Sequence, residues 1–66
     1  MAVAKIIEIS AESPEGFEAA IREGITRASK TVKNIKSAWV SDQQVEIKND
    51  KIVNYRVHLK VTFVID

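Results

Sequence analysis

The clearest pattern in the chain lies near its carboxyl end, where apolar and mostly polar residues alternate. Every second position from Val53 to Ile65 is apolar, and the residues between them include Arg56, His58 and Lys60. This period of two is typical of a strand that buries one face. It predicts a long strand over residues 53–65, extending more than about 40 Å at roughly 3.3 Å per residue.

Two earlier segments predict a strand and a helix. Residues 1–10 are rich in valine and isoleucine and lead into a polar stretch, as a first strand does. Ser13 then offers an N-cap hydroxyl, and Pro14 suits the first position of a helix. Apolar or small residues follow at steps of three and four, which predicts a helix from about Pro14 to Val32–Lys33. At 1.5 Å per residue this helix is about 30 Å long.

The segment 37–48 predicts a second strand whose apolar phase changes midway. Ala38 and Val40 occupy even positions, whereas Val45 and Ile47 occupy odd ones. A bulge or strong bend among the polar residues 41–44 accounts for the change. The following Asn-Asp-Lys has the composition of a turn, so the second and third strands form a hairpin.

These elements predict an α+β fold in the order β-α-β-β, with a three-stranded sheet and one helix packed on one face. A right-handed crossover makes the first two strands parallel, and the hairpin makes the third antiparallel to the second. Placing the long third strand in the middle satisfies both conditions. Gly24, in the middle of the helix, predicts close packing of helix on sheet. The helix cannot cover the whole third strand, so we expect a homo-oligomer.

Composition narrows the function classes. Sixty-six residues, 45% of them hydrophobic, form a single domain spanning residues 1–66 and are too few for most self-contained enzymes. The absence of cysteine excludes disulfides, thiolate nucleophiles and cysteine-ligated zinc. A net charge of +1 without a long run of one sign says nothing about partners. With no targeting segment and no apolar run long enough to span a bilayer, we expect a cytoplasmic protein without a membrane partner. The short basic stripe of the last strand has no aromatic residue on its face, so we expect no nucleic-acid partner.

Three residues of the second strand are candidates for ligand chemistry. Trp39 has only serines two positions away on either side, so it lies on an otherwise polar face. It is either an anchor in a subunit interface or a stacking platform for a planar ligand. Asp42 and Glu46 share a strand face and could hold a hard cation together with a symmetry copy, or simply be solvated. No catalytic motif is present in the sequence.

Several segments of the chain agree in order, spacing and length with one known family, although no single motif is sharp. They are Ser13-Pro14-Glu15-Gly16, Ala19-Ala20-Ile21, Arg27-Ala28, Thr31-Val32, Tyr55-Arg56-Val57 and Lys60-Val61-Thr62-Phe63. Through these segments the whole chain resembles the dodecins, a family of small β-α-β-β proteins. The resemblance implies a hollow homododecamer that sequesters flavins, either riboflavin or FMN.

The resemblance also implies which residues bind the ligand: Ser37, Trp39 and Arg56. In flavin-binding dodecins a tryptophan stacks on the flavin where this chain has Ser37, with Trp39 two residues on, and a glutamine bonds the flavin edge where this chain has Arg56. Both changes weaken flavin contacts and resemble the branch called calcium dodecins, which lacks the stacking tryptophan. We therefore predict a non-catalytic storage protein for a small ligand. The alternatives are a calcium-binding dodecin that uses Asp42 and Glu46, and a structural oligomer without ligand.

Overall fold

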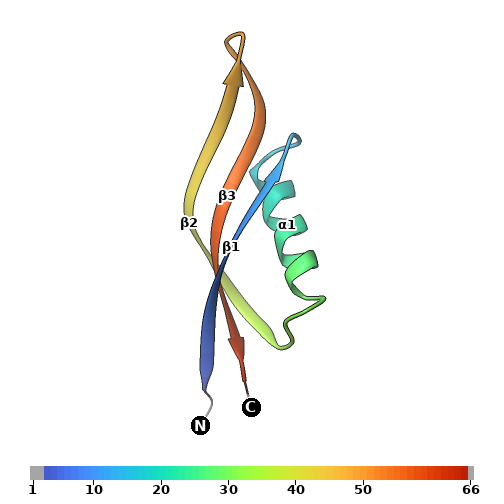
Figure 1. Ribbon diagram of the computed structural model, residues 1–66, viewed down its shortest axis with the longest axis vertical. Coiled ribbons are helices and arrows are strands. Elements are labelled where there is room, and N and C mark those ends of the chain that lie inside the picture. The colour runs from blue at the N-terminus through green and yellow to red at the C-terminus, as the bar shows by residue number, and fades with distance from the viewer. Residues whose placement is uncertain (1–2, 66) are drawn as a thin grey trace.

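The alternating segment near the carboxyl end forms the middle strand of a three-stranded sheet (Figure 1). The computed structural model describes residues 3–65 of the chain. Its elements are β1 (Ala4–Ser13), α1 (Phe17–Ala28), β2 (Ile35–Lys48) and β3 (Lys51–Val64). The sheet order β1-β3-β2, with both neighbouring pairs antiparallel, confirms the predicted topology.

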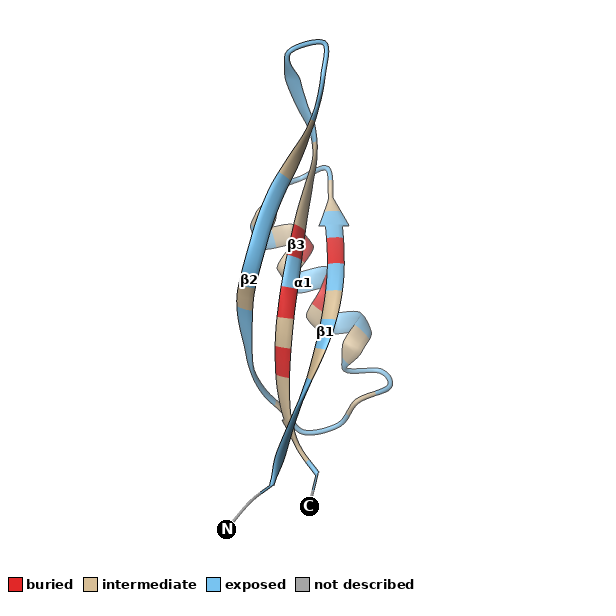
Figure 2. Ribbon diagram, turned by 60° about the vertical axis from the view of Figure 1, so that its left-hand side comes forward, coloured by how far each residue is buried: buried red, intermediate tan, exposed pale blue. Residues whose placement is uncertain are grey.

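The core lies between α1 and one face of the sheet. Figure 2 shows its buried positions alternating along β3, where Val57 and Val61 are fully buried and Leu59 is 1% exposed. Ala11 of β1 and Ala20 of α1 complete the buried hydrophobic cluster, and Gly24 of α1 is buried as well. The apolar face of β3 is therefore the one that the helix covers, as the alternation predicts.

Gly24 marks the closest approach of the helix to the sheet. A Cβ atom built on Gly24 would lie 3.0 Å from the Ala11 Cβ and 3.5 Å from the Leu59 Cδ1. Carbon atoms at 3.0 Å are already closer than the 3.5–4.0 Å of favourable contact. The missing side chain thus allows tight packing, which confirms the structural interpretation of this glycine.

The first strand is longer, and the helix starts later, than the sequence predicts. β1 continues through Ser13, which is paired with Tyr55, because β3 is long enough to pair with it along its whole length. The Ser13 hydroxyl accepts a hydrogen bond from the Glu15 backbone N–H at 3.0 Å, so it supports a turn and does not cap the helix. Gly16, with φ of 145°, occupies the N-cap position in a conformation that favours glycine. Residues 1–2 lie outside the described residues.

The predicted helix end near Val32–Lys33 is also wrong, because α1 ends at Ala28. The backbone N–H groups of Thr31 and Val32 both donate to the Ala28 carbonyl, and the Ser29 hydroxyl donates to the Thr26 carbonyl. Serine and threonine side chains compete in this way for helical carbonyls. Twelve residues make a helix of about 18 Å instead of 30 Å.

The bulge predicted within residues 41–44 is confirmed. The pairing register of β2 on β3 shifts between Val40 and Asp42, where the Ser41 hydroxyl donates to the His58 carbonyl at 3.2 Å. Two further register shifts occur, between Ile35 and Ser37 and between Glu46 and Ile47. The bulge at Ser41 sets which side chains of β2 share a face.

The β2–β3 hairpin extends beyond the helix and beyond β1 (Figure 1). Its two-residue loop, Asn49 and Asp50, has positive φ at both positions, as a type I′ turn requires. Ile47, Ile52 and Val53 near this tip are 61%, 51% and 41% exposed. The uncovered apolar tip fits the expected association of chains. No helix within residues 3–65 is long and apolar enough to cross a membrane.

Candidate functional site

The face of the sheet opposite the helix holds all five residues that the sequence predicts as ligand or metal contacts. Antiparallel partners share a face, and the register pairs Ser37 with Thr62, Trp39 with Lys60, Asp42 with His58, and Glu46 with Asn54. These partners alternate along β3 with the buried residues, as does Arg56. We call this surface, formed by β1, β2 and β3, the helix-free face.

The bulge at Ser41 is what brings Asp42 to this face. In a regular strand, Trp39 and Asp42 would point to opposite sides because their positions differ by three. The extra residue restores the phase, so that Asp42 lies opposite His58 while Trp39 lies opposite Lys60. One local irregularity therefore assembles a face that contains both an aromatic ring and carboxylates.

Arg56 is engaged by carboxylates from both edge strands. Its Nε donates to the Glu12 Oε2 at 3.0 Å, and its Nη2 donates to the Glu46 Oε1 at 3.1 Å. Asn54 Nδ2 lies 2.7 Å from the Glu12 Oε1 and 3.0 Å from the Glu46 Oε1. The Arg56 side chain is 30% exposed. These four residues form a bridge from β1 across β3 to β2, which we call the Arg56 bridge.

Trp39 stands out as the aromatic residue of the helix-free face, with 66% of its surface exposed. The Lys60 Nζ lies over its ring, 5.2 Å from the ring centroid, as in a cation–π contact. Ser37, two residues before Trp39, is exposed on the same face. The structure thus places two predicted ligand residues side by side and presents an open aromatic surface beside a cation.

Asp42 and Glu46 share the face but not the same surroundings. Glu46 is held in the Arg56 bridge, whereas Asp42 is exposed opposite His58. Within residues 3–65 no group of three or more histidine, aspartate or glutamate side chains is placed to hold a metal ion. A cation at these carboxylates would therefore need further ligands, which a second copy could supply.

Comparison with known proteins decides the family, since the family model described as Dodecin matches residues 3–66. The chain belongs to the dodecin family. It is 35% identical to the calcium dodecin of Mycobacterium tuberculosis over 63 residues, which is 96% of this chain and 89% of that protein. The resemblance inferred from the sequence is thereby confirmed, and with it the assignment of a small-ligand-binding dodecin.

Solved dodecin structures share the fold over nearly the whole chain. The dodecin from Streptomyces davaonensis is 34% identical, with a TM-score of 0.93 that covers 98% of this chain and 96% of that one. A Thermus thermophilus dodecin variant gives 32%, a TM-score of 0.94 and coverage of 100% and 98%. The calcium dodecin structure from M. tuberculosis gives 33%, a TM-score of 0.83 and coverage of 97% and 91%. The three relatives are therefore nearly equal in sequence identity, whereas the first two have the higher TM-scores.

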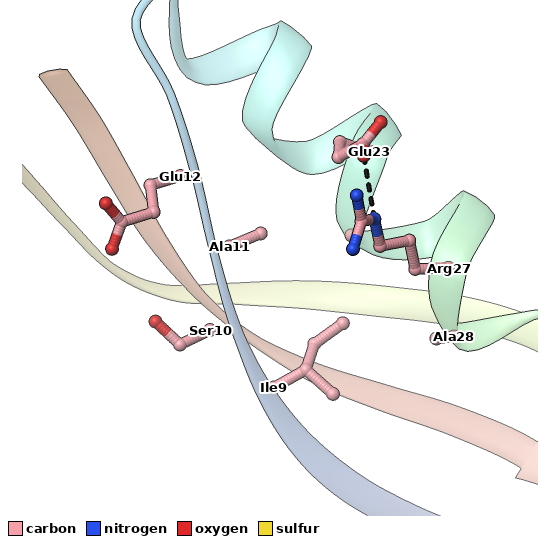
Figure 3. Close-up of a pocket in the computed structure, with 8 residues that line it drawn as sticks. Ile9, Ser10, Ala11, Glu12, Glu23, Arg27 and Ala28 are labelled. Atoms are coloured by element: carbon pink, nitrogen blue, oxygen red, sulfur yellow. Dashed lines mark hydrogen bonds and ion pairs between the residues drawn. The ribbon is translucent and has the colours of Figure 1, made fainter.

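A groove of this dodecin lies away from the predicted residues. An open groove of about 530 Å³ runs between α1 and the outer edge of β1 (Figure 3). Ile9 and Ala11 point into it from β1, and the ion pair of Glu23 and Arg27, at 2.8 Å, lies on the helix side. Glu12 points away from the helix, toward the helix-free face, as the alternation of β1 requires.

The sequence analysis does not name three residues of the helix-free face as site residues: Glu12, Asn54 and Lys60. Glu12 was beyond the predicted end of the first strand, although Glu8, Ser10 and Glu12 already show a polar period of two. Asn54 and Lys60 belong to the polar set of β3, but their partners depend on the strand register. That register is set by the bulges of β2, whose positions the sequence gives only within a few residues.

The Arg56 bridge predicts how stability depends on pH. Hydrogen bonds from Asn54 and Arg56, with the charge of Arg56, lower the pKa of Glu12 below its ordinary value of 4.5. A carboxylate whose pKa is lowered by folding stabilises the fold above its unfolded pKa, and that stabilisation is lost as the pH falls through the folded pKa. We expect Glu12→Gln to remove this contribution.

Urea denaturation at pH values from 7 down to 3 measures the contribution of Glu12 to the free energy of unfolding. Wild type should lose stability below pH 4.5 more steeply than Glu12→Gln, and the two curves should converge at the acid end. The exposed Glu15, changed to glutamine, is the control and should follow the wild-type slope. Parallel curves for wild type and Glu12→Gln would mean that the bridge does not couple proton binding to folding.

Proposed function

We propose that this dodecin is a non-catalytic, cytoplasmic storage protein that stacks a flavin on Trp39 and assembles as a homododecamer. The observation that carries the proposal is the exposed Trp39 ring on a helix-free face next to Ser37. Planar rings stack on aromatic side chains with about 1–3 kcal/mol per contact. Trp39 thus takes over the stacking role that the family gives to the residue at position 37.

Arg56 supports this site by linking the three strands and not by bonding the ligand. Its guanidinium is committed to Glu12 and Glu46, so it has little capacity to bond the edge of a flavin as the family's glutamine does. A guanidinium also has no acceptor atom to offer. We therefore expect weaker flavin binding than in a site that has both the stacking and the edge contact.

The test is a titration of riboflavin with the protein, followed by quenching of flavin fluorescence. We expect wild type to quench it and Trp39→Leu to raise the Kd by about 5- to 150-fold, the range that about 1–3 kcal/mol of stacking represents. Trp39→Phe keeps an aromatic ring, so its Kd should lie between those of wild type and Trp39→Leu. Equal Kd values for wild type and Trp39→Leu, or no quenching by wild type, would reject Trp39 as the platform.

Calcium is the second candidate ligand, and the identity of 35% to a protein named calcium dodecin favours it. Asp42 is exposed and could contribute a carboxylate, whereas Glu46 would first have to leave Arg56. Calorimetric titration with calcium chloride distinguishes the two ligands. A heat of calcium binding that is seen for wild type and abolished by Asp42→Asn would support the calcium site. No heat of binding for wild type would leave a flavin-binding protein or a structural oligomer without ligand.

A further inference from the structure

The two long cationic side chains of the helix-free face differ in how their charges are balanced. Arg56 has two carboxylate partners, Glu12 and Glu46. Lys60 makes no ion pair among residues 3–65, although Glu8 is its register partner on β1. The positive charge on this face that no ion pair balances within the described part of the chain is therefore that of Lys60, and it is the one that a ligand can use.

Lys60 also occupies the surface on which a planar ligand would stack. Its Nζ lies over the Trp39 ring, and Trp39 and Lys60 are directly opposite in the register. A ligand that stacks on that ring face must move the ammonium group aside, and the cation–π contact is then lost. The long, flexible stem of lysine allows this movement and keeps the ammonium near the edge of the ring.

A neutral planar ligand offers the displaced ammonium no anionic group, whereas an anionic ligand supplies one. Charge-assisted hydrogen bonds from lysine to phosphate are stronger than bonds between neutral groups. The same side chain therefore opposes a neutral ligand and favours an anionic one. The register partner of Arg56 on β2 is the neutral Gln44, so β2 places no further cation beside Arg56.

We propose that Lys60 is the residue that sets ligand charge at Trp39, so that the site selects planar ring systems that carry a phosphate over the same rings without one. This inference rests on the proposed function, because it requires a ligand stacked on Trp39. It adds a residue and a ligand class that stacking alone does not specify.

The test compares riboflavin with riboflavin 5′-phosphate, two ligands that share one ring system. We expect wild type at low ionic strength to bind the phosphate form about fivefold or more tightly, as for one charged contact on a partly exposed site. Lys60→Gln should lower this ratio by about fivefold, while its Kd for riboflavin becomes no weaker than in wild type. Flavin fluorescence measures both Kd values.

Lys48→Gln is the matched control, because it removes the same charge from an exposed position near the hairpin tip. It should keep the wild-type ratio. A ratio unchanged in Lys60→Gln, or lowered equally in Lys48→Gln, would overturn the role of Lys60 while the flavin proposal stands. Failure of wild type to bind either flavin would overturn the proposed function, and the role of Lys60 with it.

Discussion

Replacing Leu59 by aspartate should leave the chain unfolded. Leu59 is 1% exposed and lies in the middle of the core between Val57 and Val61. Loss of a buried leucine side chain costs about 2–5 kcal/mol, and an unpaired buried carboxylate adds several more. That sum approaches the entire stability of a small domain, which is about 5–15 kcal/mol.

Thr62→Asp is the control for this substitution. It places the same charge on the same strand, but on the helix-free face opposite Ile6 and Ser37, where no carboxylate is the register partner. We expect Thr62→Asp to keep the wild-type far-ultraviolet circular dichroism and Leu59→Asp to lose it. A folded, soluble Leu59→Asp oligomer in sedimentation would contradict the assignment of the two faces.

The second large effect is expected for Gly24→Val, which should lower the free energy of unfolding by about 2–4 kcal/mol. The new Cβ would lie 3.0 Å from the Ala11 Cβ, which is fixed to the β1 backbone and cannot rotate away. The two γ-methyl groups of valine add crowding against Leu59 and Ile9, whose Cδ1 atoms already lie 3.5 Å from that Cβ, so the helix must move off the sheet. Gly24→Ala meets the same contact but gains about 1 kcal/mol of helix propensity, so its net change should be small.

A double-mutant cycle separates crowding at Ala11 from other effects of valine. Ala11→Gly removes the atom that the Gly24→Val side chain meets first. The double variant should be more stable than the sum of the two single changes predicts, by about 1 kcal/mol or more, when urea denaturation is compared. Additive changes would show that contact between Gly24 and Ala11 does not limit the packing of helix on sheet.

The sequence predicts the fold well because the spacing of apolar residues along its strands agrees with the contacts that the strands make in the structure. The alternation from Val53 to Ile65 identifies β3 and its buried face, and the phase change between Val40 and Val45 identifies the bulge. Chain connectivity then leaves one simple order for three strands. The structure and the solved dodecins agree with that order.

The ends of the elements were harder to predict, for two physical reasons. β1 extends to Ser13 because a long neighbour offers pairing partners, and Glu12 gains an ion pair with Arg56 there. The helix stops at Ala28 because hydroxyl groups such as that of Ser29 compete for its carbonyls. Both effects depend on neighbours in space or on local geometry, which hydrophobic periodicity does not record.

The candidate site was predicted as a set of residues but not as a set of contacts. Trp39 and Ser37 lie together as expected on one face. Arg56 was predicted as a ligand residue, and the structure commits its guanidinium to Glu12 and Glu46. An arginine's partners depend on the register of three strands, so sequence spacing alone could not distinguish a bridge from a ligand contact.

Native mass spectrometry with riboflavin 5′-phosphate tests the central claim, a flavin-binding homo-oligomer, most directly. We predict one main species of about twelve times the chain mass of 7.4 kDa, carrying flavin that Trp39→Leu loses without change of assembly. A monomer would contradict the assembly. A dodecamer that carries no flavin when the ligand is present would contradict the proposed ligand.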